Sequence, residues 1–259
     1  MKKIVVLTFV TLLTASASLQ AQEFKAKFNS RQDRKVVLEM QGNDVTVEGY
    51  DGDELIIRGN GYEAPPKQAQ GLRPVYNSAV DNTQLGLAVT PGSGNTLRVV
   101  NASRQGATYS IRVPHRTALV FTQTNWNSGD LVIRDVEGSI EATLKSGDMK
   151  LVNVSGPVVA NSVSGDVTIS FNGMRQEPSS ISLVSGNLDI TMPAASKANL
   201  ALRSISGEIY TDFELNLGKG PGNMSRIGGQ TISGNINGGG GATLSLKTIS
   251  GDIFVRKAK

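Results

Sequence analysis

Short runs in which apolar and polar residues alternate recur through the second half of the chain. Two and four places after a series of glycines the residues are apolar, and the residue between them is often polar. These apolar pairs are Leu131 and Ile133, Ile140 and Ala142, Met149 and Leu151, Val158 and Ala160, Val167 and Ile169, Leu188 and Ile190, and Ile253 and Val255. Alternation with a period of two over a short run predicts a strand with one buried face.

The predicted strands are separated by a repeated tripeptide, Ser-Gly followed by Asp, Asn or Glu. Its glycines are Gly129, Gly147, Gly165, Gly186, Gly207, Gly234 and Gly251. Weaker copies at Gly138 and Gly156 space the early glycines by nine residues, four times in succession. Glycine tolerates the positive φ that a sharp bend requires, and Asp or Asn beside it can hydrogen-bond nearby backbone amides. We therefore interpret the seven glycines as structural turn positions.

The spacing of the corners favours a wound coil over a series of antiparallel hairpins. Complete Ser-Gly-Asp corners recur at 18 residues, with weaker corners halfway, as expected when the two sides of one turn alternate. Each turn would then stack about 4.8 Å from the previous one. No segment shows convincing helical periodicity over three turns. The sequence thus predicts an all-β protein, a single-stranded β-solenoid with in-register turns.

The chain before this repeat is less regular. Strands are expected at 36–40, 44–48 and 54–58, which are candidates for early turns of the same coil. Residues 59–82 contain three prolines and little periodicity, which indicates a loop insertion. Residues 22–114 are accordingly expected to form an irregular N-terminal β region, and residues 115–259 the regular solenoid.

The first 21 residues have the pattern of a secretory signal peptide. A basic start at Lys2 and Lys3 precedes an apolar stretch and then small residues, and the stretch is too short to span a bilayer stably. Cleavage is expected after Ala21, with Ala17 as the second choice. The mature protein would then be extracytoplasmic: periplasmic, on the outer surface or released.

Composition narrows the function classes. The chain has no cysteine, so an exported protein of this kind depends on strand pairing and packing without disulfides. Removing Lys2 and Lys3 leaves 24 basic and 22 acidic residues, and without a basic run this balance gives no sign of nucleic-acid binding. No stretch after the signal peptide approaches the roughly 18 apolar residues of a membrane helix.

The repeated Ser-Gly-Asp/Asn/Glu corner, entered through Val113-Pro114, resembles that of the bacterial putative-adhesin domains of unknown function. The resemblance covers residues 110–259 well and residues 30–110 loosely. It implies a stacked β-fold, an envelope location and an adhesin-like role, and it supplies no catalytic residues. Pro157 and the long interval between Gly207 and Gly234 depart from the pattern and leave the number of turns open.

The acidic residues at the corners are the strongest candidates for chemistry. In-register turns would place Asp130, Asp148 and Asp166 in one column, extended by Asn187, Glu208, Asn235 and Asp252. Stacked carboxylates repel one another, and calcium could bridge them with its preference for oxygen ligands. The calcium-binding glycine-aspartate nonapeptide is not matched, however. A turn-and-cap role is therefore favoured over a metal site.

Other chemistry finds little support. The lone His115 makes no transition-metal site by itself, and the serines lack the surroundings of a nucleophile. No catalytic residue and no cofactor is expected. Trp126, Tyr210 and Phe254 fall near outward positions, where they are candidates for a surface contact with a sugar or a partner.

The leading hypothesis is a non-catalytic envelope protein, adhesin-like, that presents an extended solenoid surface to a glycan, a protein or another copy of itself. A second hypothesis is an extracytoplasmic regulatory or stress-sensing module that captures one partner. A third, a polysaccharide-cleaving β-helix enzyme, is disfavoured because its clustered carboxylates would need long side loops, whereas the loops between these strands are mostly short.

Overall fold

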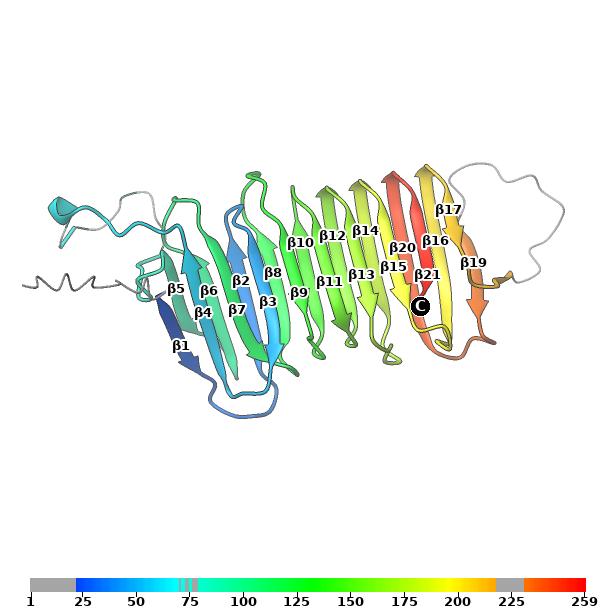
Figure 1. Ribbon diagram of the computed structural model, residues 1–259, viewed down its shortest axis with the longest axis horizontal. Helices are drawn as coiled ribbons and strands as arrows, with labels where there is room; N and C mark the ends of the chain where they lie inside the picture. Colours follow the sequence, from blue (N-terminus) through cyan, green and yellow to red (C-terminus); the bar gives the residue numbers. More distant parts are fainter. Residues whose placement is uncertain (1–21, 70, 73–74, 76–78, 218–230) are drawn as a thin grey trace, which may run out of the picture.

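In the computed structural model, residues 22–69, 71–72, 75, 79–217 and 231–259 are described. The protein is all-β: the described part of the chain contains 21 strands, and its helical content is a single 3-10 turn, η1 (Lys67–Ala69). The strands form two long sheets that face each other along an elongated body (Figure 1). The predicted fold class, a β-solenoid, is confirmed.

We call the two sheets A and B. Sheet A has the spatial order β1 (Glu23–Lys27), β4 (Glu54–Asn60), β7 (Thr108–Pro114), β3 (Val45–Tyr50), β9 (Leu131–Arg134), β11 (Met149–Val154), β13 (Val167–Phe171), β15 (Leu188–Met192), β21 (Ile253–Lys257), β17 (Ile209–Thr211). Sheet B has the order β18 (Asn216–Leu217), β19 (Ile232–Ile236), β16 (Ala198–Ser206), β20 (Ala242–Ser250), β14 (Ser179–Ser185), β12 (Val158–Ser164), β10 (Ile140–Leu144), β8 (Ala118–Gln123), β2 (Lys35–Met40), β6 (Thr96–Asn101), β5 (Leu87–Pro91).

Each turn of the solenoid is a rung made of one strand of sheet B, a corner and one strand of sheet A. Neighbouring rungs are parallel and in register: Met149 pairs with Leu131 on one side and with Val167 on the other, a step of 18 residues each way. Within the described residues, paired strands form eight rungs, in the spatial order β6/β7, β2/β3, β8/β9, β10/β11, β12/β13, β14/β15, β20/β21, β16/β17.

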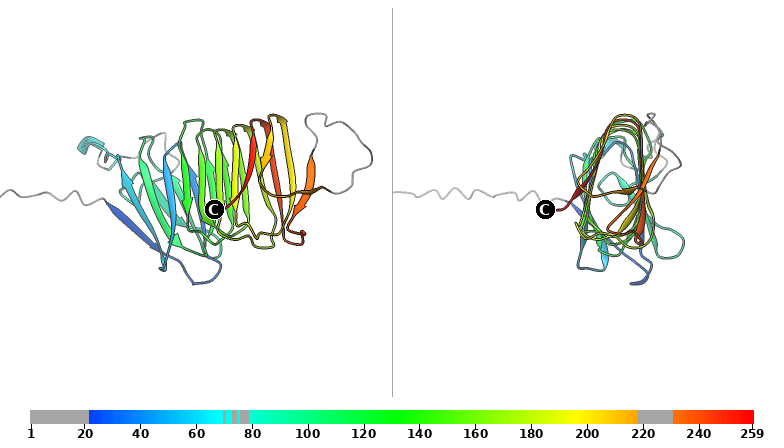
Figure 2. Two further views of the ribbon diagram at one scale, coloured as in Figure 1. Left: turned by 45° about the vertical axis from the view of Figure 1, so that its right-hand side comes forward. Right: turned by 90° about the vertical axis from the view of Figure 1, so that its right-hand side faces the viewer.

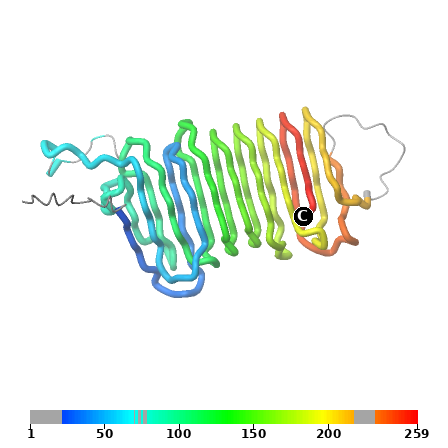
Figure 3. The backbone as a smooth tube through the Cα atoms, viewed as in Figure 1, coloured from blue at the N-terminus to red at the C-terminus, as the bar shows by residue number. Residues whose placement is uncertain are grey.

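The rungs do not follow the order of the sequence at either end of the stack. Rung β2/β3 lies between β6/β7 and β8/β9, and rung β20/β21 lies between β14/β15 and β16/β17. Figures 1 and 3 show the red C-terminal strands between the yellow-green and yellow ones. Both ends of the described chain therefore fold back beside inner rungs, which corrects the expectation of consecutive stacking.

Antiparallel strands cover both ends of the solenoid, although the corner spacing favoured a coil alone. At one end β4 pairs with β7, β1 with β4, and β5 with β6. At the other end β19 pairs with β16, and β18 with β19. A stack of parallel strands exposes unpaired backbone at its last rung, so these added strands act as caps.

The space between the sheets is filled by one continuous apolar core. The narrow cross-section is visible in the right-hand view of Figure 2. The six residues on which the sequence interpretation depends most all point into this core and are at most 1% exposed: Leu131, Ile133, Val167, Ile169, Leu188 and Ile190. The alternating pattern thus identified the buried face correctly.

The neighbouring rung requires glycine at the Ser-Gly-Asp/Asn/Glu corners, Gly129 included, and all of them except Gly129 also have positive φ. Gly165 has φ +121°, and a Cβ built on it would lie 2.1 Å from the carbonyl oxygen of Gly147. The same relation holds between Gly186 and Gly165. Gly234 is an exception, since it lies inside strand β19. Its Ser-Gly-Asn tripeptide does not form a corner because β19 runs antiparallel along β16 as part of the cap.

Candidate functional site

The side chains at the corners form a continuous hydrogen-bonded column along one side of the solenoid. The backbone N–H of Asp148 donates to Oδ1 of Asp130 at 2.9 Å, and the N–H of Asp166 donates to Oδ1 of Asp148 at 2.8 Å. This column continues in the same way: the N–H groups of Asn187, Asp252 and Glu208 donate to the Oδ1 atoms of Asp166, Asn187 and Asp252, respectively. It begins where the N–H of Asp130 donates to Oδ1 of Asp44.

Two members of the expected column are placed differently. Along the column Asp252 comes before Glu208 because rung β20/β21 is inserted, and Asn235 lies in β19, outside this column. Asp44 was missed because its Gly-Asn-Asp corner lacks the Ser-Gly signature. Each side chain satisfies an amide of the next corner, which is how a capping residue works. Among the described residues, no group of three or more His, Asp or Glu side chains is arranged to hold a metal ion.

The three aromatic candidates do not form one surface. Tyr210 and Phe254 stack with ring centroids 5.2 Å apart on sheet A, and the Arg256 guanidinium lies 5.0 Å from the Phe254 ring. Trp126 lies at the corner of rung β8/β9, five rungs from β17, where the Lys145 ammonium lies 5.6 Å from its ring. The structure therefore joins two of the three and separates the third.

His115 lies in the connection from β7 to β8. Its Nδ1 is 2.7 Å from the Asp135 carbonyl oxygen, which can only accept, so Nδ1 carries the proton in this contact. Its Nε2 is 3.5 Å from Oδ1 of Asp51. The connection passes over the inserted rung β2/β3, and these contacts fasten it there.

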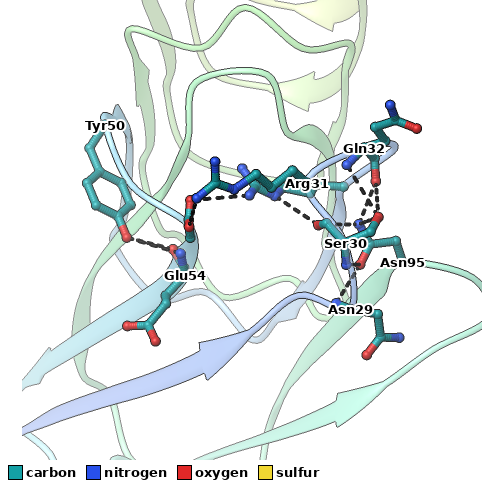
Figure 4. Close-up of polar contacts among 9 residues, drawn as sticks. Asn29, Ser30, Arg31, Gln32, Tyr50, Glu54 and Asn95 are labelled. Carbon is teal, nitrogen blue, oxygen red and sulfur yellow. Dashed lines mark hydrogen bonds and ion pairs between the residues drawn. The ribbon is translucent and has the colours of Figure 1, made fainter.

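A polar cluster at the N-terminal end forms a second candidate (Figure 4). The Asn95 side chain accepts from the Asn29 amide at 2.8 Å and donates to the carbonyl oxygens of Ser30 and Gln32 at 3.0 and 2.6 Å. Arg31 pairs with Asp53 at 2.9 Å beside them. Because these groups satisfy one another, the cluster fixes a loop and leaves few polar groups directed at a ligand.

A third candidate surrounds the connection between β4 and β5. Burial, and then a hydrogen bond to Asp81, raise the pKa of Tyr62 to about 12. Burial acts to raise the pKa of Asp81, but the N–H groups of Thr83 and Gly86 donate to its carboxylate and lower that pKa overall. An ionised Asp81 therefore organises this loop, which is again a structural role.

A surface groove on the outer face of sheet B is chemically different from these clusters. We call its apolar wall the aliphatic ladder: Val163, Val184, Ile249 and Ile205, which occupy equivalent positions on four consecutive rungs. They are 38%, 45%, 48% and 50% exposed. Each side chain points outward just before a Ser-Gly corner, so the ladder follows the solenoid axis.

The opposite wall of the groove is polar and ends in two cations. Asn161, Ser182, Lys247 and Arg203 form a second column, in which Arg203 is the direct register partner of Lys247. The groove is an open cavity of about 410 Å³ lined by both columns. Neither cation has an ion-pair partner within the described residues. The arrangement suits a ligand with a long apolar part and an anionic end.

Sequence reasoning missed this groove, although a signal was present. In the four corners of the ladder the residue directly before Ser-Gly is Val or Ile, whereas the earlier corners have Asn127 and Lys145 at that place. Val154 and Ile232 also precede Ser-Gly but lie outside the ladder, so this signal is partial, and the strand pairings are needed to identify the ladder.

The fold and the groove define a capped, parallel β-solenoid with an exposed apolar strip. A family model described as Toastrack DUF4097 matches residues 110–256, more than half of the chain, and the chain belongs to that family. Within the described residues no helix is long and apolar enough to cross a membrane. No match was found among curated proteins.

Matches among solved structures are to proteins that share little sequence with this chain. A putative cell adhesion protein from Clostridium sporogenes is 10% identical with a TM-score of 0.42, and the match covers 91% of this chain and 99% of that one. A putative adhesin from Bacteroides fragilis is 13% identical (TM-score 0.36; 90% and 96% covered). A putative lipid binding protein from Parabacteroides distasonis is 10% identical (TM-score 0.28; 93% and 98% covered).

Proposed function

We propose that this is an exported, adhesin-like binding protein of the cell envelope, and that the groove on sheet B is its contact surface. The observation that carries the proposal is the aliphatic ladder: four large apolar side chains lie exposed on consecutive rungs. Scattered exposed apolar residues are ordinary, whereas a contiguous strip beside polar residues is typical of an interaction site.

The rigid stack supports recognition by an extended surface. The strands beneath the ladder pair with one another in register, so the spacing of the ladder residues is fixed by the sheet. A ligand contacting four rungs would meet a preorganised surface, which lowers the entropic cost of binding.

Export is proposed from the sequence. The expected signal peptide, residues 1–21, lies outside the described residues, and its cleavage after Ala21 remains a prediction.

The proposal is tested by fractionating cells that carry the wild-type protein or groove variants. Val184→Asp and Ile249→Asp place charges in the ladder, and Val159→Asp is the matched control, since Val159 is exposed on β12 outside the groove. We expect the groove variants to shift from the envelope to the soluble fraction, with Val159→Asp unchanged. Equal distribution of all four proteins would contradict the proposal.

Crosslinking of intact cells separates the adhesin-like role from the regulatory alternative. A regulatory module is expected to yield one stable protein partner that depends on Val184 and Ile249. Envelope association without such a partner supports the adhesin-like role.

A further inference from the structure

We propose that the groove binds a fatty acid, with its acyl chain along the aliphatic ladder and its carboxylate between Arg203 and Lys247. This inference rests on the proposed function and specifies the ligand of the same surface. It follows from the shape of the apolar wall, the state of the backbone beneath it and the distribution of charge.

The apolar wall has the form of a narrow strip. Its four side chains are separated by three rung spacings, so the ladder is about 14 Å long. A volume of about 410 Å³ lies in the range of small-molecule sites. A single acyl chain laid along the axis would contact all four ladder residues.

The backbone under the groove disfavours a peptide in the same place. Strands β12, β14 and β20 each lie between two hydrogen-bonded neighbours, and β19 pairs with β16 over Ala198–Leu202, before the part of β16 that lines the groove. No edge for an added peptide strand lies beneath Val163, Val184 or Ile249, and a peptide lying across them would need other partners for its own N–H and C=O groups. An acyl chain has no such groups to satisfy.

Charge identifies the chemistry of the other end of the ligand. Arg203 and Lys247 are both exposed and lie directly opposite each other in the register of β16 and β20. Like charges in this position repel, and an anion between them relieves the repulsion. The two positive charges lie on the last two of the four rungs, beside Ile249 and Ile205, so a ligand with a single anionic head would place it near that end of the ladder.

The same charge distribution argues against a second copy of this face. The outward residues of β10, β12, β14, β20 and β16 include one carboxylate, Glu141, and two cations, Arg203 and Lys247. Two such faces packed together would bring their apolar ladders into contact while leaving half of the positive charge without an opposite charge.

The test is calorimetric titration of the purified mature protein with laurate, lauryl alcohol and hexanoate. We expect wild type to bind laurate, to bind lauryl alcohol about tenfold more weakly because it lacks the anionic head, and to give no measurable heat with hexanoate, which has too little apolar surface.

Variants assign the two halves of the site. Val184→Asn with Ile249→Asn should weaken the binding of both long-chain ligands at least tenfold. Arg203→Gln with Lys247→Gln should weaken laurate about tenfold and leave lauryl alcohol unchanged. Val159→Asn and Lys150→Gln, on surfaces outside the groove, should change neither. Circular dichroism checks that each variant keeps its strand content.

Absence of laurate binding to wild type overturns the inference, as does laurate binding that the ladder variants leave intact. If laurate fails while Val184→Asp and Ile249→Asp still release the protein from the envelope, the proposed function stands and the ligand is of another class. If those aspartate variants remain in the envelope, the groove is not the contact surface and the proposed function fails.

Discussion

At the residue scale, the residue type that a corner position accepts is set by the neighbouring rung as well as by its own backbone conformation. Gly147, Gly165 and Gly186 have positive φ and also lie against a carbonyl oxygen of the adjacent corner. The Oδ1 atom of the Asp or Asn that follows accepts a hydrogen bond from the backbone N–H of the next corner. The Ser-Gly-Asp tripeptide is thus the local solution to stacking identical bends at a spacing of about 4.8 Å.

Gly165→Ala should lower the free energy of unfolding by about 2–3 kcal/mol, because alanine is strained at φ +121° and its Cβ would overlap the Gly147 carbonyl. Gly173→Ala is the control, since a Cβ added there would meet no atom within 4 Å beyond its chain neighbours, and the φ of Gly173 is not positive. It should change stability by less than about 0.5 kcal/mol. Urea unfolding measures the free energy of unfolding of both variants. An equal loss of stability in the two would contradict the account.

Asp148→Ala should cost about 1 kcal/mol, because the Asp166 amide loses its acceptor. Asp148→Asn should cost much less, since Asn187 already fills this role two rungs away with its Oδ1. Thermal unfolding of the two variants tests the difference. A stabilisation by calcium that Asp148→Asn abolishes would instead support the cation-binding alternative.

At the scale of strands, alternation identifies each element and its buried face but leaves the neighbours undetermined. The corners at Gly207 and Gly251 have nearly the same local pattern, so either could stack on the corner at Gly186. The choice depends on the whole C-terminal arrangement: β19 pairs antiparallel with β16, which places β16 at the outside and β20 within. Such non-local pairing has no signature in a single strand.

The inserted rung predicts which engineered cysteines can join. Ser185 is the register partner of Ser250, and Ser250 is the partner of Ser206. Ser185→Cys with Ser250→Cys should form a disulfide on mild oxidation, because adjacent strands lie within its geometric range. Ser185→Cys with Ser206→Cys, two rungs apart, should not. Because the chain has no cysteine of its own, mass spectrometry can assign any disulfide to the introduced pair. A disulfide between positions 185 and 206, with none between 185 and 250, would indicate consecutive stacking instead.

The connection between β4 and β5 depends on an ionised Asp81. Asp81→Asn should cost about 1–3 kcal/mol at neutral pH, because an amide nitrogen replaces one of two oxygens that accept backbone N–H groups of Thr83 and Gly86. The folded pKa of Asp81 is lowered, so its stabilisation is complete above the ordinary value near 3.8 and is lost as pH falls through the folded pKa. The difference between wild type and variant in urea unfolding should therefore shrink below pH 3.8; a difference independent of pH would contradict this.

At the scale of the whole molecule, the insertion of rungs β2/β3 and β20/β21 accompanies capped ends and a long, regular side. Sequence reasoning found the solenoid because the core repeat is local in the chain. It missed the groove because the ladder appears only when Val184, Ile249 and Ile205 are placed on adjacent rungs, an order that the strand pairings determine. The aromatic residues expected to mark a surface are divided between distant rungs instead.

Thiol footprinting in cells tests most directly whether the ladder is an occupied binding surface. Ile249→Cys and Val159→Cys each introduce a single thiol at a well-exposed position, one in the groove and one outside it. In the purified protein both should react readily with a maleimide reagent. In intact envelopes the label at position 249 should fall several-fold while that at position 159 stays the same. Equal labelling of position 249 in envelopes and in isolation would show that nothing covers the ladder and would contradict the account.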